Sequence, residues 1–224
     1  MPLVALLHTG EAHVEAFAGL FEEILPEAML SHLVREDLPL RAQLAGGVTP
    51  EIAAETAASL RELADQGARL LLCTCSTLGP AVEAAAAEIE VPVLRVDRPL
   101  AEAAVAAGGR LLVVAALETT LAPTRALLED AAAKAGRTVV LETLSLPEAW
   151  AAFEAGERAG YVRQIAEAVR ARVRDETGGF DAVVLVQASM AGAADELADL
   201  GVPVLASPRL AVRRAAEVYC RSAD

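Results

Sequence analysis

The alternation of short apolar runs with longer amphipathic segments is the feature that most constrains the fold of this chain. Runs 2–8, 68–74 and 180–187 are short and apolar, whereas segment 11–25 places its apolar residues at helical spacing. Run 68–74 does not alternate apolar with polar residues, which is typical of a strand buried on both faces. The same strand-helix order continues to the end of the sequence and predicts an α/β fold with parallel sheets covered by helices.

Two stretches of the chain resemble each other, and this internal repeat predicts two domains. Residues 70–96, LLLCTCSTLGPAVEAAAAEIEVPVLRV, and residues 183–207, VVLVQASMAGAADELADLGVPVLAS, both read as apolar strand, small polar turn, helix and V-P-V-L. Pro99 and Pro208 follow these strands and mark helix starts. We therefore expect two similar α/β domains related by a pseudo-twofold axis. The predicted domains are residues 1–97 with 208–224, and residues 98–207.

Three local patterns predict where helices begin, break or are missing. Thr49 and Pro50 have the residue types of an N-cap and a first helical position. Segment 147–175 is predicted to be helical with a break near Gly156. Segment 35–47 shows no strong period, so a loop with irregular helix is expected there.

Charge and cysteine content exclude several classes of protein. The net charge of −13 disfavours nucleic acid as a partner, since phosphate binding needs basic patches. No apolar run reaches the roughly 18 residues of a membrane span, and no secretory signal is visible. Three cysteines, two of them one residue apart, do not suit a disulfide framework. We expect a cytoplasmic protein that contacts neither membrane nor nucleic acid.

Small polar residues follow four of the predicted strands. In parallel α/β sheets, ligands bind beyond the carboxyl ends of strands, where helix N-termini and backbone N–H groups suit a carboxylate. No G-x-G-x-x-G or G-x-x-x-x-G-K-[ST] motif follows any strand, so no nucleotide cofactor is expected. The polar turns contain His8 and Thr9; Cys75, Ser76 and Thr77; Thr119 and Thr120; and Gln187 and Ser189.

Cys75 is the most informative of these residues. It follows a buried strand and precedes a helix, where a thiol is expected to have a lowered pKa and to act as a nucleophile or base. On that basis Cys75 should be the fastest of the three cysteines to alkylate near neutral pH. The alternative is a small buried hydrophobic residue, which is how we interpret Cys73; Cys220, in the last helix, is expected to pack. A metal or redox C-x-C pair is a third interpretation.

These residues resemble the cofactor-independent aspartate/glutamate/hydantoin racemase superfamily over nearly the whole chain. The sequence CSTLG is similar to the first cysteine motif of that family, which places Cys75 at the catalytic thiol. The sequence VVAALETT is similar to the segment that holds the substrate carboxylate, which points to Thr119. The resemblance implies two α/β domains with the active site in the cleft between them. It also implies substrate-binding roles for Ser76, Thr77, His8 and Thr9.

The second cysteine motif of that family is missing. Family racemases use two cysteines on opposite faces of the substrate, and the second motif is typically Leu-X-Cys-Thr. Here the segment reads LVQASM, so that Gln187 or Ala188 takes the place of the second cysteine. Neither is an acid or a base, and the hydroxyl of Ser189 is too weak an acid to replace a thiol. The resemblance therefore implies the scaffold and a carboxylate pocket without two-base racemisation.

The leading hypothesis is an isomerase-like enzyme that acts on a small carboxylate or amino-acid-like compound through Cys75, without cofactor or metal. The alternatives are a non-catalytic or regulatory carboxylate-binding homologue, and a one-thiol decarboxylase or lyase. A homodimer is left open as the assembly. The expected substrate-binding residues are His8, Thr9, Ser76, Thr77, Thr119, Thr120, Gln187 and Ser189.

Overall fold

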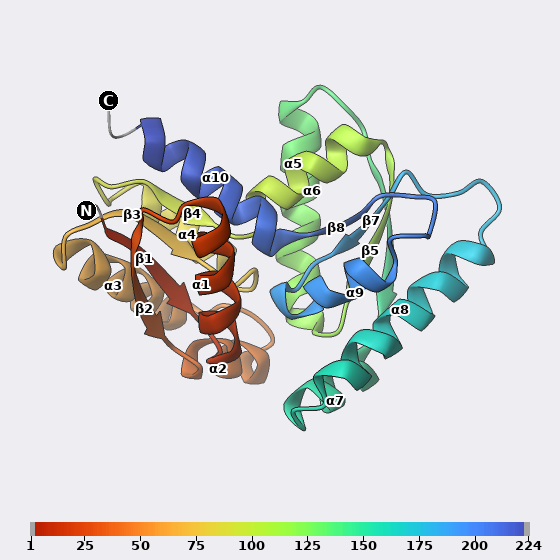
Figure 1. The fold of residues 1–224 in the computed structure, drawn as a ribbon, viewed down its shortest axis with the longest axis horizontal. Coiled ribbons are helices and arrows are strands. Elements are labelled where there is room, and N and C mark those ends of the chain that lie inside the picture. The colour runs from red at the N-terminus through yellow and green to blue at the C-terminus, as the bar shows by residue number, and fades with distance from the viewer. Residues whose placement is uncertain (1–2, 222–224) are drawn as a thin grey trace. The chain divides into compact units, whose positions relative to one another are not determined.

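A computed structural model describes residues 3–221. The chain divides into two compact units, which are treated separately below (Figure 1). Unit 1 contains Met1–Pro99 and Pro208–Asp224, and unit 2 contains Leu100–Ser207. Among residues 3–221, no helix combines the length and apolar character needed to cross a membrane.

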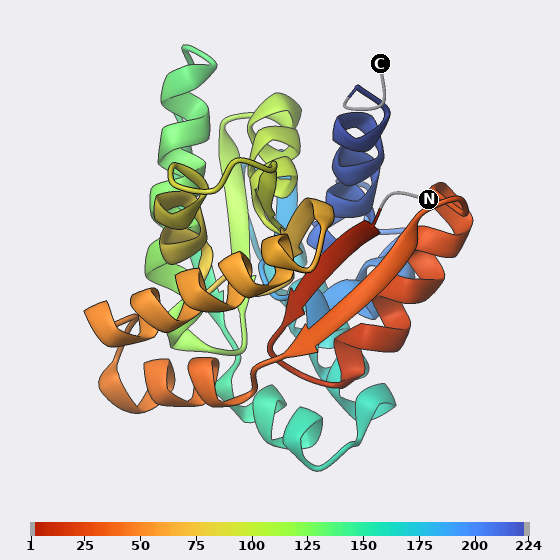
Figure 2. The same cartoon turned by 90° about the vertical axis from the view of Figure 1, so that its left-hand side faces the viewer.

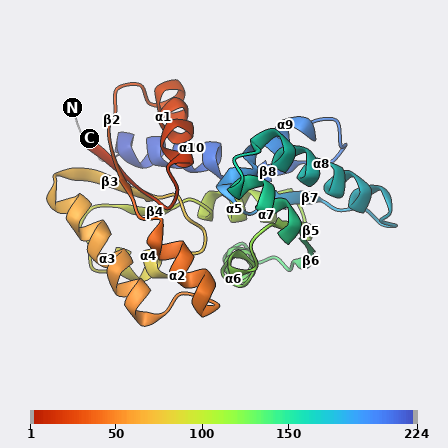
Figure 3. The ribbon, with the colours of Figure 1, turned by 90° about the horizontal axis from the view of Figure 1, so that it is seen from below.

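Unit 1 is built on a four-stranded parallel sheet with the order β2-β1-β3-β4. Helices α1 and α10 cover one face of this sheet, and α3 and α4 cover the other (Figures 2 and 3). The strands are β1 (Leu3–His8), β2 (Met29–Val34), β3 (Ala68–Cys73) and β4 (Val93–Arg95). The helices are α1 (Ala12–Ile24), α2 (Asp37–Ala45), α3 (Pro50–Asp65), α4 (Gly79–Ala86) and α10 (Ser207–Arg221).

Unit 2 has the same strand topology, β6-β5-β7-β8, and its pairs are again parallel. Helices α5 and α6 lie on one face of its sheet, and α8 and α9 on the other (Figures 1 and 3). The strands are β5 (Arg110–Ala115), β6 (Val140–Ser145), β7 (Ala182–Leu185) and β8 (Val204–Ala206). The helices are α5 (Arg98–Ala107), η1 (Glu118–Thr120), α6 (Leu121–Lys134), α7 (Pro147–Glu154), α8 (Arg158–Arg174), η2 (Ala188–Met190) and α9 (Ala191–Glu196).

The central strands are buried on both faces, as their unbroken apolar sequence predicts. In β3, Leu71 and Cys73 belong to the core packed against α3 and α4, whereas the alternate residues Leu70 and Leu72 face the other way and are equally buried. The α/β class with parallel sheets is therefore confirmed. The V-P-V-L repeat corresponds to β4 and β8, the last strand of each sheet.

The local helix predictions are mostly confirmed, and one is wrong. Thr49 caps α3, its side-chain oxygen accepting a hydrogen bond from the Ile52 N–H, and Pro50 is the first helical residue. Gly156, with φ +78°, separates α7 from α8. Segment 35–47 was expected to be mainly loop but contains the regular helix α2, because Leu38 and Ala42 are anchored in the core four residues apart.

Candidate functional site

In unit 1 the thiol of Cys75 lies among hydrogen-bond donors at the carboxyl end of the sheet. Strand β3 ends at Cys73, and Cys75 points to the same side of the sheet, where it joins the core beneath α4. The hydroxyls of Thr9 and Thr77 and the backbone N–H groups of Thr77 and Leu78 donate to the Cys75 sulfur. The structure therefore brings together Thr9, Cys75 and Thr77, from two turns that are far apart in sequence.

Burial decides the protonation state of this thiol. Cys75 is only 8% exposed, and loss of hydration raises its pKa; the hydrogen bonds from Thr9, Leu78 and Thr77 only partly offset this. The expectation of a lowered pKa is therefore wrong, because the donors near the helix N-terminus do not outweigh desolvation. Cys75 rests as a neutral thiol, which is ready to give a proton.

The same reasoning predicts how the three cysteines react. Iodoacetamide at pH 7 should modify Cys220 first, because Cys220 is exposed and not packed as the sequence suggested. Cys75 should react slowly, with a rate that rises about tenfold per pH unit below its raised pKa. Cys73 should react last, because burial in β3 raises its pKa further. Peptide mapping by mass spectrometry after timed alkylation measures the order. Fastest labelling at Cys75 at pH 7 would contradict the burial argument.

His8 is a buried structural residue of unit 1. The Thr74 hydroxyl donates to the Leu7 carbonyl at 3.3 Å, so it accepts from His8 Nδ1 at 3.0 Å. His8 Nε2 then accepts from Nδ1 of His32 at 2.9 Å. Burial, with smaller contributions from His32 and His13, lowers the pKa of His8 to about 3, so the ring stays neutral. Both ring nitrogens are occupied and the residue is 0% exposed, which corrects the expectation that His8 points to a substrate.

A buried ion pair that sequence reasoning missed packs against the start of α4. Arg95 donates from Nε and one terminal nitrogen to Asp97, at 2.6 and 2.9 Å, and both side chains are nearly fully buried. A Cβ on Gly79 would lie 2.1 Å from the Arg95 guanidinium, so a larger residue at the first position of α4 would require Arg95 to move. Arg95 is the last residue of β4 and Asp97 directly follows the strand pattern of residues 91–96, a position at which charged residues can be identified from sequence.

In unit 2 the strand register identifies the counterpart of Cys75. Leu7 pairs with Cys73 in one sheet, and Val114 pairs with Leu185 in the other. Beyond these pairs, the Thr74 N–H donates to the Leu7 carbonyl, and the Val186 N–H donates to the Val114 carbonyl. The residue after Thr74 is Cys75, and the residue after Val186 is Gln187. Gln187, not Ala188, therefore occupies the equivalent position.

The Gln187 side chain accepts hydrogen bonds from the turn that follows β5. Its Oε1 accepts hydrogen bonds from the N–H groups of Ala116 and Leu117, at 2.6 and 3.0 Å, and the residue is 7% exposed. The backbone N–H groups of these turns were expected to bind a carboxylate. In this turn, two of them are instead hydrogen-bonded within the protein. In the neighbouring η1, the Thr120 hydroxyl donates to the Leu117 carbonyl at 2.6 Å and is buried, whereas Thr119 is half-buried.

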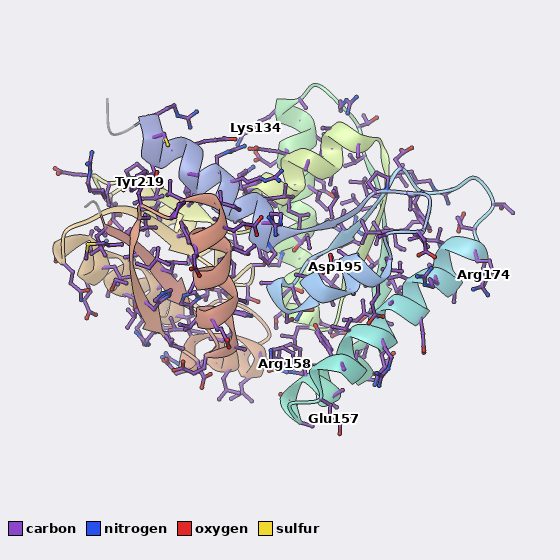
Figure 4. All side chains as sticks on the ribbon, in the orientation of Figure 1. Lys134, Glu157, Arg158, Arg174, Asp195 and Tyr219 are labelled. Carbon is purple, nitrogen blue, oxygen red and sulfur yellow. The ribbon has the colours of Figure 1, made fainter. Side chains whose placement is uncertain are left out.

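The remaining site residues are Ser189 and Ser76. Ser189 shares a 2.9 Å hydrogen bond with the Tyr161 hydroxyl, and burial raises the pKa of Tyr161 to about 12. Sequence analysis did not identify Tyr161, which packs against Phe153 with ring centroids 5.1 Å apart. Arg158, labelled in Figure 4 at the start of α8, stacks over the Phe153 ring. Ser76 is buried in the Cys75 turn, and its carbonyl accepts from the Gly79 N–H.

The third interpretation of the C-x-C pair concerns the groups that surround Cys73 and Cys75. Within the described part of the chain, His, Cys, Asp and Glu do not gather in groups of three or more that could hold a metal ion. Cys73 and Cys75 are both free and lie on the same side of their chain segment, with the Cys73 sulfur 4.0 Å from the Cys75 carbonyl oxygen.

Comparisons with solved structures match the two-unit fold. Glutamate racemase from Francisella tularensis in complex with D-glutamate has 13% identity and a TM-score of 0.69, covering 99% of this chain and 82% of that one. Allantoin racemase from Klebsiella pneumoniae has 19% identity and a TM-score of 0.68, covering 99% and 89%. Arylmalonate decarboxylase has 16% identity and a TM-score of 0.59, covering 97% and 92%. These likenesses show the fold.

The family assignment comes from the sequence itself. The model of the Asp/Glu/hydantoin racemase family matches residues 9–215, and the chain therefore belongs to this family. A comparison with curated protein sequences gave no significant match.

Proposed function

We propose that this chain is a cofactor-independent enzyme that transfers a proton at the carbon next to the carboxylate of a small acid, with Cys75 as the acid–base group. The observation that carries the proposal is the convergence of Thr9, Thr77 and backbone N–H donors on the Cys75 sulfur. Such donors stabilise the thiolate that remains once the proton has been given away. A residue buried only for packing needs none of them.

The polar groups around the proposed site suit a carboxylate. Thr9 and Thr77 in unit 1, and Thr119 in unit 2, each lie beyond the carboxyl ends of the parallel strands of their own sheet, where such ligands bind. Their hydroxyls can donate to carboxylate or enolate oxygens, and preorganised donors of this kind supply much of the barrier reduction when an enolate forms. The structurally similar racemase from F. tularensis carries D-glutamate, a small carboxylate.

Gln187 limits the reaction to one thiol. A carboxamide neither gives nor takes a proton at neutral pH, and Gln187 stands at the position equivalent to Cys75. Ser189 does not replace a second thiol, because its hydroxyl is too weak an acid. Tyr161 does not replace it as a base, because its raised pKa keeps the phenol protonated. We propose protonation from the Cys75 face alone, without two-base racemisation of aspartate or glutamate.

A one-thiol decarboxylase is the second candidate, and the neutral resting state of Cys75 favours it. In such a reaction the bond between the α-carbon and a carboxylate breaks, CO₂ leaves, and the electron pair remains on the α-carbon. The thiol S–H bond then breaks and its proton goes to that carbon, which leaves a thiolate for solvent to reprotonate. A thiol with a raised pKa begins this sequence in the required form. Arylmalonate decarboxylase shares the fold.

Incubation with single enantiomers of small amino and hydroxy acids in deuterated water tests the proposal. We expect slow uptake of deuterium at the α-carbon with retained configuration: the thiolate fraction of Cys75 takes the α-proton, the resulting S–H exchanges with solvent, and the S–D group returns deuterium to the same face. Mass spectrometry measures uptake, and chiral chromatography measures configuration. Substituted malonates, tested in the same way, should release CO₂ if decarboxylation is the reaction.

The matched variant is Gln187→Cys, which places a second thiol at the equivalent position. It should add inversion of configuration to the exchange of the wild-type protein. Inversion by the wild type would contradict the one-thiol proposal. Absence of uptake and of CO₂ release with all these acids, together with retained binding, would favour the non-catalytic carboxylate-binding alternative.

A further inference from the structure

Two backbone hydrogen bonds hold the side chain of Gln187 in one orientation. Its Oε1 accepts from the Ala116 N–H at 2.6 Å and the Leu117 N–H at 3.0 Å. Because a carboxamide nitrogen cannot accept these bonds, the two backbone donors fix which end of the amide is oxygen. The Nε2 group must therefore point away from the β5 turn.

The Nε2 group has two hydrogens to donate and no partner in residues 3–221. No hydrogen bond from Nε2 is present in this part of the chain, whereas Oε1 makes two. Enclosed side-chain polar atoms without a hydrogen-bond partner are found in this part of the chain at Thr124, Ser207 and Tyr219, but not at Gln187. Nε2 consequently reaches the surface of unit 2 with unused donors, although only 7% of the residue is exposed.

We propose that Gln187 Nε2 donates a hydrogen bond to a carboxylate oxygen of a small acid bound at the carboxyl end of the unit 2 sheet. This assignment rests on the proposed function and gives the missing second thiol a replacement with a different task. Where a cysteine would move a proton, the amide contributes a neutral, fixed donor. The ligand class is accordingly a small acid that presents an oxygen acceptor to unit 2.

A structural role alone makes a different prediction. If Gln187 served only to satisfy Ala116 and Leu117, any side chain with a carboxyl oxygen at the same place would suffice. Glutamate supplies that oxygen and has nearly the same shape, but at neutral pH it has no N–H and adds a negative charge. Gln187→Glu therefore preserves the contacts to the turn and removes the proposed donor.

Titration of malonate into the wild-type protein and into Gln187→Glu separates the two roles. We expect both proteins to unfold at similar temperatures without malonate, since the acceptor is kept. We expect malonate to bind the variant at least tenfold more weakly by calorimetry, because a hydrogen bond to a charged acceptor is lost and repulsion is gained. Gln164→Glu is the control for the added charge, since Gln164 is an exposed residue of α8.

Side-chain amide NMR provides a second measurement on the same proteins. The chain has four glutamines and no asparagine, so the amide spectrum contains four NH₂ pairs. The pair lost in Gln187→Glu identifies Gln187. In the wild type we expect malonate to shift this pair more than those of Gln43, Gln66 and Gln164.

The outcomes distinguish this inference from the proposed function. Equal malonate affinity in wild type and Gln187→Glu, with an unmoved Gln187 pair, would overturn the donor role and leave the Cys75 site intact. Failure of the wild type to bind malonate, acetate or glutamate would overturn the carboxylate site itself and this assignment with it. Weaker binding by the variant and a shifted pair would support both.

Discussion

Replacement of Cys75 by alanine is expected to reduce α-proton exchange, or CO₂ release, by about 10²–10⁴-fold while the fold remains intact. The reason is that Cys75 is the one group at the unit 1 turn that can carry the proton. His8 is held neutral by a pKa of about 3, and the Thr9 and Thr77 hydroxyls are far too weak as acids. Rates of deuterium uptake in the two proteins, compared at equal concentration, measure the effect.

Cys220→Ala is the matched control for the loss of a thiol. Cys220 is exposed on α10, so its removal should change neither turnover nor stability. Circular dichroism before each assay establishes that the Cys75 variant is folded. Full activity in a folded Cys75→Ala protein would show that another group carries the proton, and would remove the basis of the proposed mechanism.

Replacement of Asp97 by alanine is expected to destabilise the protein by about 3–5 kcal/mol. Asp97 neutralises Arg95 through two hydrogen bonds, and the two side chains are 2% and 4% exposed. Without Asp97 the guanidinium remains buried against Gly79 with one contact to the half-exposed Glu83. The free energy of unfolding from urea titration, followed by circular dichroism, measures the loss.

Glu23→Ala is the control for removal of a carboxylate. Glu23 pairs with Arg209, but both side chains are about half exposed, so solvent screens the pair and its loss should change the free energy of unfolding little. If Asp97→Ala lowered the free energy of unfolding no more than Glu23→Ala, the loss of the buried pair would be compensated by solvent or by rearrangement of Arg95. The Cys75 turn would then not depend on it.

The order of strand, turn and helix around the candidate residues could be predicted from sequence, but the protonation state of Cys75 could not. Hydroxyl-rich turns after apolar strands were predicted to hold Cys75 and Thr77 in one domain and Thr119 in the other, and each turn follows the carboxyl end of a strand of its own sheet. The ionisation of Cys75 depends on how completely neighbouring chain excludes water. The exclusion of water is a property of packing, and burial reversed the expected direction of the Cys75 pKa shift.

The sequence by itself determined the α/β class, the parallel sheets and the repeated strand-helix order, because apolar periodicity encodes which faces of each element are buried. Tertiary structure alone decided three features of the candidate site: the burial of His8, the pairing of Arg95 with Asp97 and the register that makes Gln187 the counterpart of Cys75. Each depends on contacts between segments whose spacing along the chain says nothing about distance in space. A one-residue ambiguity in a motif is resolved only by the hydrogen bonds between strands, since these fix which residues lie side by side.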